Sequence, residues 1–556
     1  MTSGRFINMV LAKIIDRVGD SNPQIFRELK ERLTVRNLGI ALGAALVIQV
    51  FVLMYFNSQL PVPDLTPGLD KSARQIYSRY CEMVPNGYQA YGSYCRLNGD
   101  GEFIINWQTW WSDLFIAMSW LLPLGLILGS VYTLVADLVQ EEKRGTLNFI
   151  RLSPQSARTI FIGKILGVPS LVYLATIATL PLHIVAGYTA GANTLLLASW
   201  YVTIACFWFL MSSAAVLYVL LGGIQAIVTV LVVAYPVCLP ILAINAFASA
   251  TINRDTWLVK PTELSWFGLP IFNNAMLFYA FGTGCCLVAS FGVWQALERR
   301  YLNPTATAIS KSQSYFTNLC IQIWIAGFVV PLVPQSYYSK EGTIVAWAII
   351  DFLVLLVSIP MLLPGKQALL DWSRYRRERA AHKSRPFWQR ELFKDLMFKD
   401  SSPALLAIAM NIGITMLLWL PIGMTAFKTS STGIRFIAGT CLAASLILIY
   451  ATIAHLGLFL KQKKRNVWIV AIVVTTMILP IVGAFVLSPF HNPSGFAAIL
   501  LLFSPLAPVG ILQLAGGSIL ATFAAQLAIF AGLTRQLQRK LQISGQSQTK
   551  ELLAHS

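Results

Sequence analysis

The residues best suited to a mechanical or chemical role lie in one short polar segment, 137–164, between two long apolar runs. They are Glu142, Gly145, Thr146, Leu147, Pro154, Gly163 and Lys164. Gly145 and Thr146 can end one helix and begin another, because glycine adopts backbone angles closed to other residues and threonine caps helix starts. The short stretch that follows carries apolar side chains that need something to pack against. Two interpretations stay open: a ridge that fits the groove of a partner protein, or an interfacial helix packed on its own chain.

The Gly163-Lys164 pair does not belong to a phosphate-binding loop. In a G-x-x-x-x-G-K-[ST] motif a hydroxyl residue follows the lysine and an earlier glycine opens the loop, whereas here Ile165 follows and that glycine is missing. The five histidines are scattered, and the sequence has no zinc-ligand cluster and no Ser/His/Asp or Cys/His arrangement in a supporting context. We therefore expect that the chain is not an enzyme, binds no metal or cofactor and does not hydrolyse ATP itself.

Asp351 is the clearest ionisable residue inside an apolar run. Charged residues at membrane depth are costly, and they often mark ion or proton pathways. The sequence allows two roles for Asp351: part of a cation or proton pathway, or a hydrogen bond between two helices.

Cys81 and Cys95 are the two cysteines that fall in a predicted outside loop. An oxidising exterior would allow them to form a disulfide, and we expect this bond. The alternative is a pair of unrelated free thiols.

The elements that position these residues are predicted to be membrane-spanning helices. Of the 556 residues, 56% are hydrophobic and 12% are charged, whereas soluble domains carry about 25% charged residues. Apolar runs of about 20 residues can cross a hydrocarbon core of about 30 Å as helices. We predict an all-α fold, a polytopic transmembrane helical bundle of about 12 spans. The predicted spans cover residues 38–56, 114–136, 165–188, 195–221, 224–248, 277–297, 319–333, 344–363, 403–426, 436–460, 467–487 and 511–533.

The net charge of +18 follows from an excess of Lys and Arg in the segments predicted to lie inside, which orients the chain in the membrane. With the N-terminus inside, most of the 42 Lys and Arg residues fall in inside loops, as the positive-inside rule requires. We expect both termini in the cytoplasm and contacts of the basic loops with anionic lipid headgroups. Nucleic-acid binding is not expected.

Five parts are predicted along the chain: a cytoplasmic segment, a first membrane unit, a basic cytoplasmic linker, a second membrane unit and a cytoplasmic tail. Their bounds are 1–37, 38–363, 364–402, 403–533 and 534–556. The first part contains an amphipathic elbow helix, which can lie in the headgroup plane. The first membrane unit holds about eight spans, an outside loop at 57–113 and the segment 137–164; the second holds about four spans.

This division rests on a weak internal repeat. Residues 386–396 share Pro, Arg, Glu, Leu and Leu with residues 23–33 at a constant offset, and each copy precedes an apolar run. The match is typical of two fused membrane units, and two unrelated amphipathic helices at the membrane surface would produce it equally well.

Two features of the chain resemble the type-2 permeases of ATP-binding cassette (ABC) exporters. One is the pattern Glu142-x-x-Gly145-Thr146-Leu147 with Pro154 and Gly163-Lys164, placed between the second and third spans. The other is the elbow helix with Arg27, Glu28 and Leu29, followed by a span and an outside loop. The resemblance covers residues 20–225 and implies that separate ABC ATPase subunits, which bind the ATP, dock on the inside loops. Family members commonly have six spans and work in pairs, which raises the question of a second permease copy here.

From this resemblance we expect a multi-pass permease in a bacterial-type inner membrane. Carried over to this sequence, the seven residues of segment 137–164 would be coupling residues that transmit ATP-driven movement. Two other functions stay open: a secondary transporter driven by an ion gradient, and a membrane assembly factor without a transport role. The substrate does not follow from the sequence.

Overall fold

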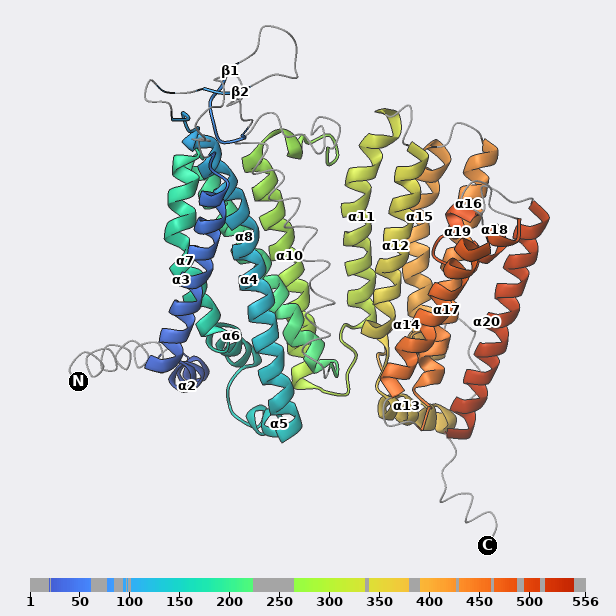
Figure 1. Cartoon of the computed structure of the whole chain (residues 1–556). Coiled ribbons are helices and arrows are strands. Elements are labelled where there is room, and N and C mark those ends of the chain that lie inside the picture. Colours follow the sequence, from blue (N-terminus) through green and yellow to red (C-terminus); the bar gives the residue numbers. More distant parts are fainter. Residues whose placement is uncertain are drawn as a thin grey trace. The chain divides into compact units, whose positions relative to one another are not determined.

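The computed structural model describes residues 20, 22–61, 78–84, 94–96, 98, 102–223, 265–335, 340–379, 391–426, 430–461, 465–487, 495–510 and 516–544. These residues form long helices and one pair of two-residue strands (Figure 1). Packing divides the chain into two compact units. The first consists of Met1–Lys260 and Ile271–Tyr301, and the second of Pro261–Pro270 and Leu302–Ser556.

The first unit surrounds one long helix, α4, which packs against α7 and α8. Its elements are α2 (Pro23–Arg32), α3 (Val35–Ser58), β1 (Met83–Val84), β2 (Tyr94–Cys95), α4 (Trp107–Arg144), α5 (Thr146–Arg151), α6 (Ala157–Gly167), α7 (Ser170–Thr189), α8 (Thr194–Leu220), the 3-10 helix Ile271–Asn273 and α10 (Ala275–Leu302). The strands lie at one end of α4, whereas α5 continues from the other end (Figure 1).

The second unit is centred on α16, which packs against α12, α15, α17, α19 and α20. Its elements are α11 (Lys311–Gln335), α12 (Lys340–Leu362), α13 (Lys366–Arg379), α14 (Glu391–Phe398), α15 (Leu405–Ala426), α16 (Ser430–Gly457), α17 (Arg465–Leu487), α18 (Gly495–Leu501), α19 (Ala507–Gly510) and α20 (Gly516–Ser544). The core cluster of this unit gathers small and branched side chains from α12, α15 and α16.

The helical architecture is that of a multi-pass membrane protein. Within the described part of the chain, nine helices are long and apolar enough to cross a membrane, and each overlaps a predicted span. The predicted span 344–363 corresponds to Trp347–Leu362, which bends by 71° into Lys366–Tyr375, and 467–487 contains the shorter apolar helix Trp468–Ala484. The predicted span 224–248 lies outside the described residues, so the count of about 12 stays a prediction.

The boundary between the two units differs from the predicted one. The sequence repeat placed it in the linker 364–402, whereas packing places it after Tyr301. The physical reason is that α11 and α12 pack against α15, and α12 also packs against α16. Half of the predicted spans therefore belong to each unit, and 364–402 follows the second helix of the second unit. Of the repeated sequence in the linker, the structure describes the part from Glu391, where α14 begins.

A small hairpin lies at the end of the first unit where α4 begins (Figure 1). β1 pairs with β2 antiparallel, with Met83 opposite Cys95 and Val84 opposite Tyr94. A disulfide joins Cys81 to Cys95, and both residues are buried beside Phe103. The two cysteines that the sequence analysis paired are thus bonded at the base of this hairpin.

Candidate functional site

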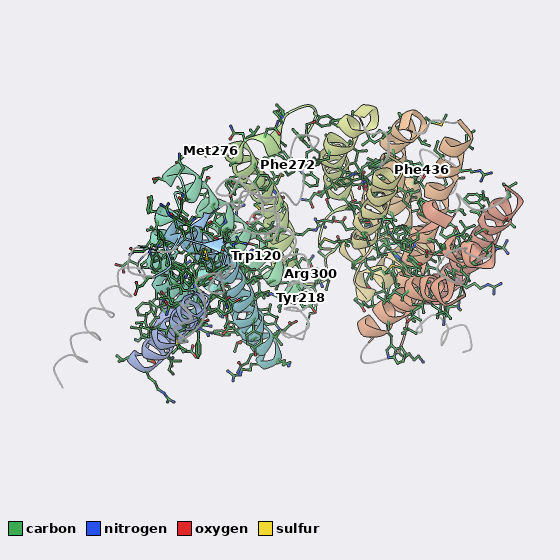
Figure 2. The ribbon with its side chains drawn as sticks, turned by 45° about the horizontal axis from the view of Figure 1, so that its top comes forward. Trp120, Tyr218, Phe272, Met276, Arg300 and Phe436 are labelled. Carbon is green, nitrogen blue, oxygen red and sulfur yellow. A yellow bond between two sulfur atoms is a disulfide. The ribbon has the colours of Figure 1, made fainter. Side chains whose placement is uncertain are left out.

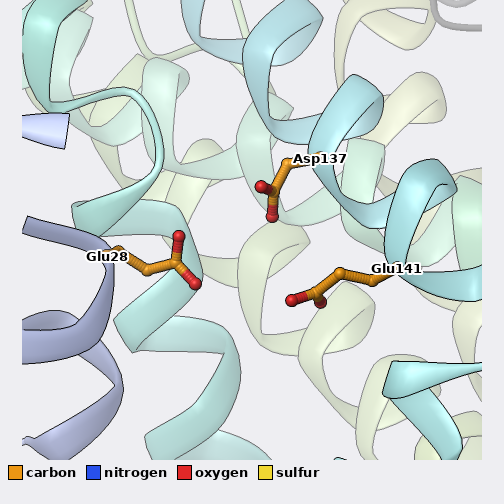
Figure 3. A group of neighbouring side chains, drawn as sticks. All are labelled: Glu28, Asp137 and Glu141. Atoms are coloured by element: carbon orange, nitrogen blue, oxygen red, sulfur yellow. The ribbon is translucent and has the colours of Figure 1, made fainter. Parts of the chain in front are cut away.

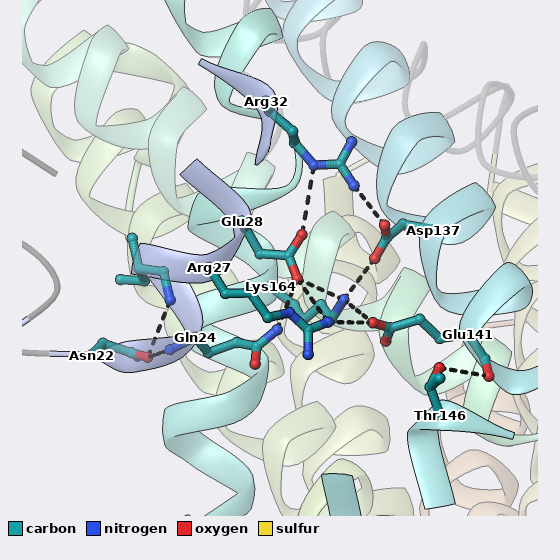
Figure 4. A network of polar contacts seen from close by, with 10 residues as sticks. Asn22, Gln24, Arg27, Glu28, Arg32, Asp137, Glu141, Thr146 and Lys164 are labelled. Carbon is teal, nitrogen blue, oxygen red and sulfur yellow. Dashed lines mark hydrogen bonds and ion pairs between the residues drawn. The ribbon is translucent and has the colours of Figure 1, made fainter. Parts of the chain in front are cut away.

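The end of α4 opposite the hairpin meets α2 and α6 in a polar cluster (Figure 4). α2 begins there because Asn22 caps it: its Oδ1 accepts from the backbone N–H of Gln24 (2.9 Å) and of Ile25 (3.3 Å), and Pro23 fills the first helical position. The Asn22 Nδ2 donates to the carbonyl of Thr159 on α6 (2.8 Å). One residue therefore starts α2 and fastens it to α6.

Two glycines on α6 bring α2 close. A Cβ on Gly163 would lie 2.6 Å from Cβ of Gln24, and a Cβ on Gly167 would lie 2.5 Å from Cβ of Glu28. Residues four apart share one face of a helix, so Gly163 and Gly167 form a flat strip beneath α2. The strip lets the Glu28 carboxylate reach the side chain of Lys164.

Lys164 occupies the centre of the cluster and is fully buried. Its Nζ lies 2.8 Å from Oε1 of Glu28, 2.7 Å from Oδ2 of Asp137 and 2.7 Å from Oε1 of Glu141. Burial lowers the pKa of this ammonium, but the charges of Asp137, Glu28 and Glu141 outweigh burial and leave the pKa above its usual value. Lys164 therefore stays charged at physiological pH.

The three carboxylates converge from α2 and α4 (Figure 3). Such a set could in principle ligate a metal ion. Here the Lys164 ammonium lies within hydrogen-bond distance of all three. The arrangement is accordingly an ion-pair hub, with the lysine in the place that a cation would take.

Two arginines of α2 complete the cluster. Arg27 Nη2 lies 2.7 Å from Oε1 of Glu141, and Arg32 Nη2 pairs with Oδ1 of Asp137. Together with Lys164 they match the three carboxylates in charge. α2, α4 and α6 are therefore joined through ionic contacts that neutralise one another.

α5 carries the exposed part of the site. It follows directly from α4 through Gly145, whose φ of 76° lies in the left-handed region that favours glycine. The Thr146 hydroxyl donates to the carbonyl of Glu141 (3.1 Å), which fixes the turn. These two residues end one helix and begin the next.

The apolar side chains of α5 and the residue after it divide between two faces. Leu147 and Ile150 are buried in the core with α4, α6 and α8. Phe149 and Leu152 are 78% and 85% exposed. The two predicted roles of this stretch thus fall on two faces. Leu147 and Ile150 pack on the chain itself, and Phe149 and Leu152 form an outward ridge of the kind that could enter a partner's groove.

The remaining predicted residues of the segment lie outside the Lys164 cluster. Burial raises the pKa of Glu142, and the charges of Arg151 and Arg300, which lower it, have the smaller effect. Pro154 lies in the turn between α5 and α6, and Ser156 caps α6. Arg300, which is labelled in Figure 2, lies on α10. Its Nε donates to the carbonyl of Leu220 (3.1 Å) and connects α10 with the end of α8.

No known protein family, curated protein or solved structure matches this chain. The site is therefore interpreted from its own geometry.

Of the elbow residues, Arg27 and Glu28 join the cluster, and Leu29 is partly buried on α2.

The sequence analysis missed Arg32, Asp137 and Glu141. A signal was present, because Asp137 and Glu141 are four residues apart near the charged end of α4, and Glu28 and Arg32 are four apart on α2. Each pair lies on one helix face. Asp351 lies far along the chain on α12 in the second unit, where it is buried.

Proposed function

We propose that this chain is the membrane subunit of an ABC exporter, and that α5 and Leu152 dock a separate cytoplasmic ATPase subunit, which binds the ATP. The observation that carries the proposal is the divided face of this stretch. A short helix that is anchored by Leu147 and Ile150 and presents Phe149 and Leu152 outward suits the groove of a partner. Exposed aromatic and aliphatic side chains at an otherwise polar end of a protein are typical of a protein interface.

The Lys164 cluster connects the proposed docking helix α5 with the membrane helices. Leu147 and Ile150 join α5 to the core around α4, and the ion pairs join α4 to α2 and α6. α2 leads directly into α3, and α6 leads into α7. When the ATPase subunits close on ATP and shift α5, the movement reaches α3, α4 and α7 together. Such movement is what alternating access or lateral extrusion of a substrate requires.

The second unit supplies a matching segment at the same place in its order of helices. Residues 364–402 follow its second long helix, as 137–164 follow the second predicted span of the first unit. α13 packs through Leu369 and Trp372 against Leu458 and the end of α20. We infer that this basic segment docks a second ATPase copy and contacts anionic lipid headgroups, so that one chain provides both halves of the transporter in the bacterial-type inner membrane.

The decisive experiment is affinity purification from gently solubilised native membranes, with mass spectrometry of the proteins that co-elute. The wild-type protein should co-elute with an ABC ATPase. The double variant Phe149→Ser, Leu152→Ser should co-elute with clearly less ATPase than wild type, because only residues 364–402 would still dock a copy, and its melting temperature should stay unchanged, because both side chains are exposed. A matched control is Leu302→Ser, since Leu302 is 78% exposed outside α5.

Leu147→Asp is a poor choice for this purpose. Leu147 is 3% exposed, and a charge there would disrupt folding before it reported on docking. If the wild-type protein purifies intact without an ATPase, or if the double variant retains it fully, the proposed docking role of α5 is wrong.

A further inference from the structure

Asp351 lies beside a small cavity within the second unit. It is 4% exposed, and the cavity, with a volume of about 30 Å³, is also lined by Thr415, Trp419 and Thr440. A cavity of this size can hold one water molecule. Among the described residues, neither carboxylate oxygen of Asp351 has a hydrogen-bond partner, although Gln322 and Trp419 approach it from α11 and α15.

A row of polar side chains runs along α11 and α15 to this cavity. Its members are spaced four residues apart on each helix: Ser314, Asn318 and Gln322 on α11, and Asn411, Thr415 and Trp419 on α15. Trp419 Nε1 donates to Oε1 of Gln322 (3.0 Å), Asn318 Nδ2 donates to Oγ1 of Thr415 (3.2 Å), and Asn411 Nδ2 donates to Oγ of Ser314 (3.1 Å). Polar contacts therefore connect the cavity with one end of the unit.

Lys311 lies at that end of the row. It is fully buried, and its Nζ donates to the carbonyls of Leu396 (2.8 Å) and Pro403 (3.1 Å) and to Oγ of Ser402 (2.6 Å). The Ser314 hydroxyl donates to the Lys311 carbonyl (2.7 Å). The ammonium of Lys311 is engaged with neutral acceptors and does not serve as the counter-ion of Asp351.

Other titratable groups on the helices around α12 do not line the cavity. They are Lys311, Tyr315 and Cys320 on α11 and Arg435, Cys441, Tyr450 and His455 on α16; α15 and α19 carry none. The other charged residues of α12, Lys340 and Glu341, stand at its start. Among the residues that the structure describes, the cavity thus brings no cationic side chain to the carboxylate.

We propose that Asp351 is a reversible proton-binding site in the second unit, and that the polar row connects its cavity with the Lys311 end of the unit. A charged carboxylate inside a membrane helix bundle is costly without a partner, and a bound proton removes that charge. A metal ion fits less well, because such ions need a shell of several oxygens and most of the side chains that line the cavity are apolar. The proposal adds a proton-linked step to transport and does not depend on the ATPase partner.

The test uses the full-length protein in lipid vesicles and infrared spectroscopy. Wild type should show the carbonyl stretch of a protonated carboxylic acid, and this band should change reversibly between about pH 5 and pH 9, the range in which buried carboxyls titrate. Asp351→Asn, which has the shape of the protonated acid, should lack the band and melt at or above the wild-type temperature. Asp371→Asn is the matched control, because the Asp371 side chain is 60% exposed, and it should keep the band.

A second measurement needs no variant. Dicyclohexylcarbodiimide, which reacts with protonated carboxyl groups in apolar surroundings, should label the peptide that contains Asp351, and labelling should fall as pH rises. The proposal is overturned if Asp351→Asn leaves the infrared band unchanged, if the carbodiimide does not label this peptide, or if sodium ions rather than pH control the wild-type melting temperature. None of these readouts involves ATP, so their failure is separate from a failure of the docking proposal.

Discussion

At the residue scale, Lys164 is the side chain that joins α2, α4 and α6 through ion pairs. A buried cation is tolerated when it is paired and hydrogen-bonded, and Lys164 is within 2.8 Å of three carboxylate oxygens from two other helices. Replacing Lys164 by an uncharged residue would leave its carboxylate partners without their shared counter-ion. Glu28, which is itself buried, would then be an uncompensated charge.

Lys164→Met should destabilise the protein strongly. Breaking a buried ion pair by removing one partner costs about 3–5 kcal/mol, so we expect a large fall in the melting temperature measured in lipid nanodiscs. Adding Glu28→Gln should recover part of the loss, because it removes one of the orphaned charges. The control Arg96→Ala breaks an exposed pair with Glu82 and should change stability by less than about 1 kcal/mol. A Lys164→Met protein that melts like wild type would mean that the cluster does not hold the helices together.

Gly167→Ala tests the close approach of α2 to α6. The new Cβ would lie 2.5 Å from Cβ of Glu28, so α2 must move and the unfolding free energy should fall by about 1–3 kcal/mol. Gly39→Ala on α3 is matched to it, because a Cβ there meets nothing within 4 Å; it should be neutral or stabilising by up to about 1 kcal/mol. Equal effects at the two positions would contradict the packing of α2 on α6.

At the element scale, the ends of helices were more predictable than their partners. Asn22-Pro23 and Gly145-Thr146 carry local signals for a helix start and a helix break, and the structure places these events there. The predicted span 165–188 merged two helices, because α6 ends at Gly167 within a continuous apolar run and hydropathy does not register such a break. The partners of Lys164 could not be assigned from sequence, since α2, α4 and α6 meet through packing.

The hairpin at the start of α4 should depend on its disulfide. A cross-link that closes a loop of about 15 residues stabilises by about 3 kcal/mol in the chain-entropy description. We expect the double variant Cys81→Ser, Cys95→Ser to be cleaved faster by protease between residues 78 and 106, with the helices left intact. Peptide mapping without reduction should recover the two cysteines linked. Both thiols free in protein from native membranes would contradict the bond and the oxidising location of this loop.

At the scale of the whole molecule, two units in one chain replace the unequal division that the sequence suggested. The repeat at 386–396 drew attention to similar amphipathic helices, but a boundary between units depends on which helices pack together. α11 and α12 precede the linker in sequence and yet pack with α15. Hydropathy locates such helices well, but it does not indicate which other helices they pack against.

If one chain provides both halves of the transporter, the purified complex should contain one copy of this chain and two ATPase copies. Each unit offers one segment after its second predicted span, and each segment would engage one ATPase. Native mass spectrometry of the detergent-released complex measures this ratio directly. A complex with two copies of this chain would contradict the assignment and favour pairing of two permeases.

The length of α4 has a mechanical consequence. Its 38 residues correspond to about 57 Å of helix, nearly twice a hydrocarbon core of about 30 Å. Pro123 interrupts its backbone hydrogen bonds, and prolines are where helices bend. If α4 bends at Pro123, the stretch from Pro123 to Gly145 would move as one arm of about 33 Å together with the core side chains that pack on it. A tilt of about 5° on an arm of this length would move α5 by about 3 Å, and the length of the arm would therefore limit the movement that a docked ATPase could transmit.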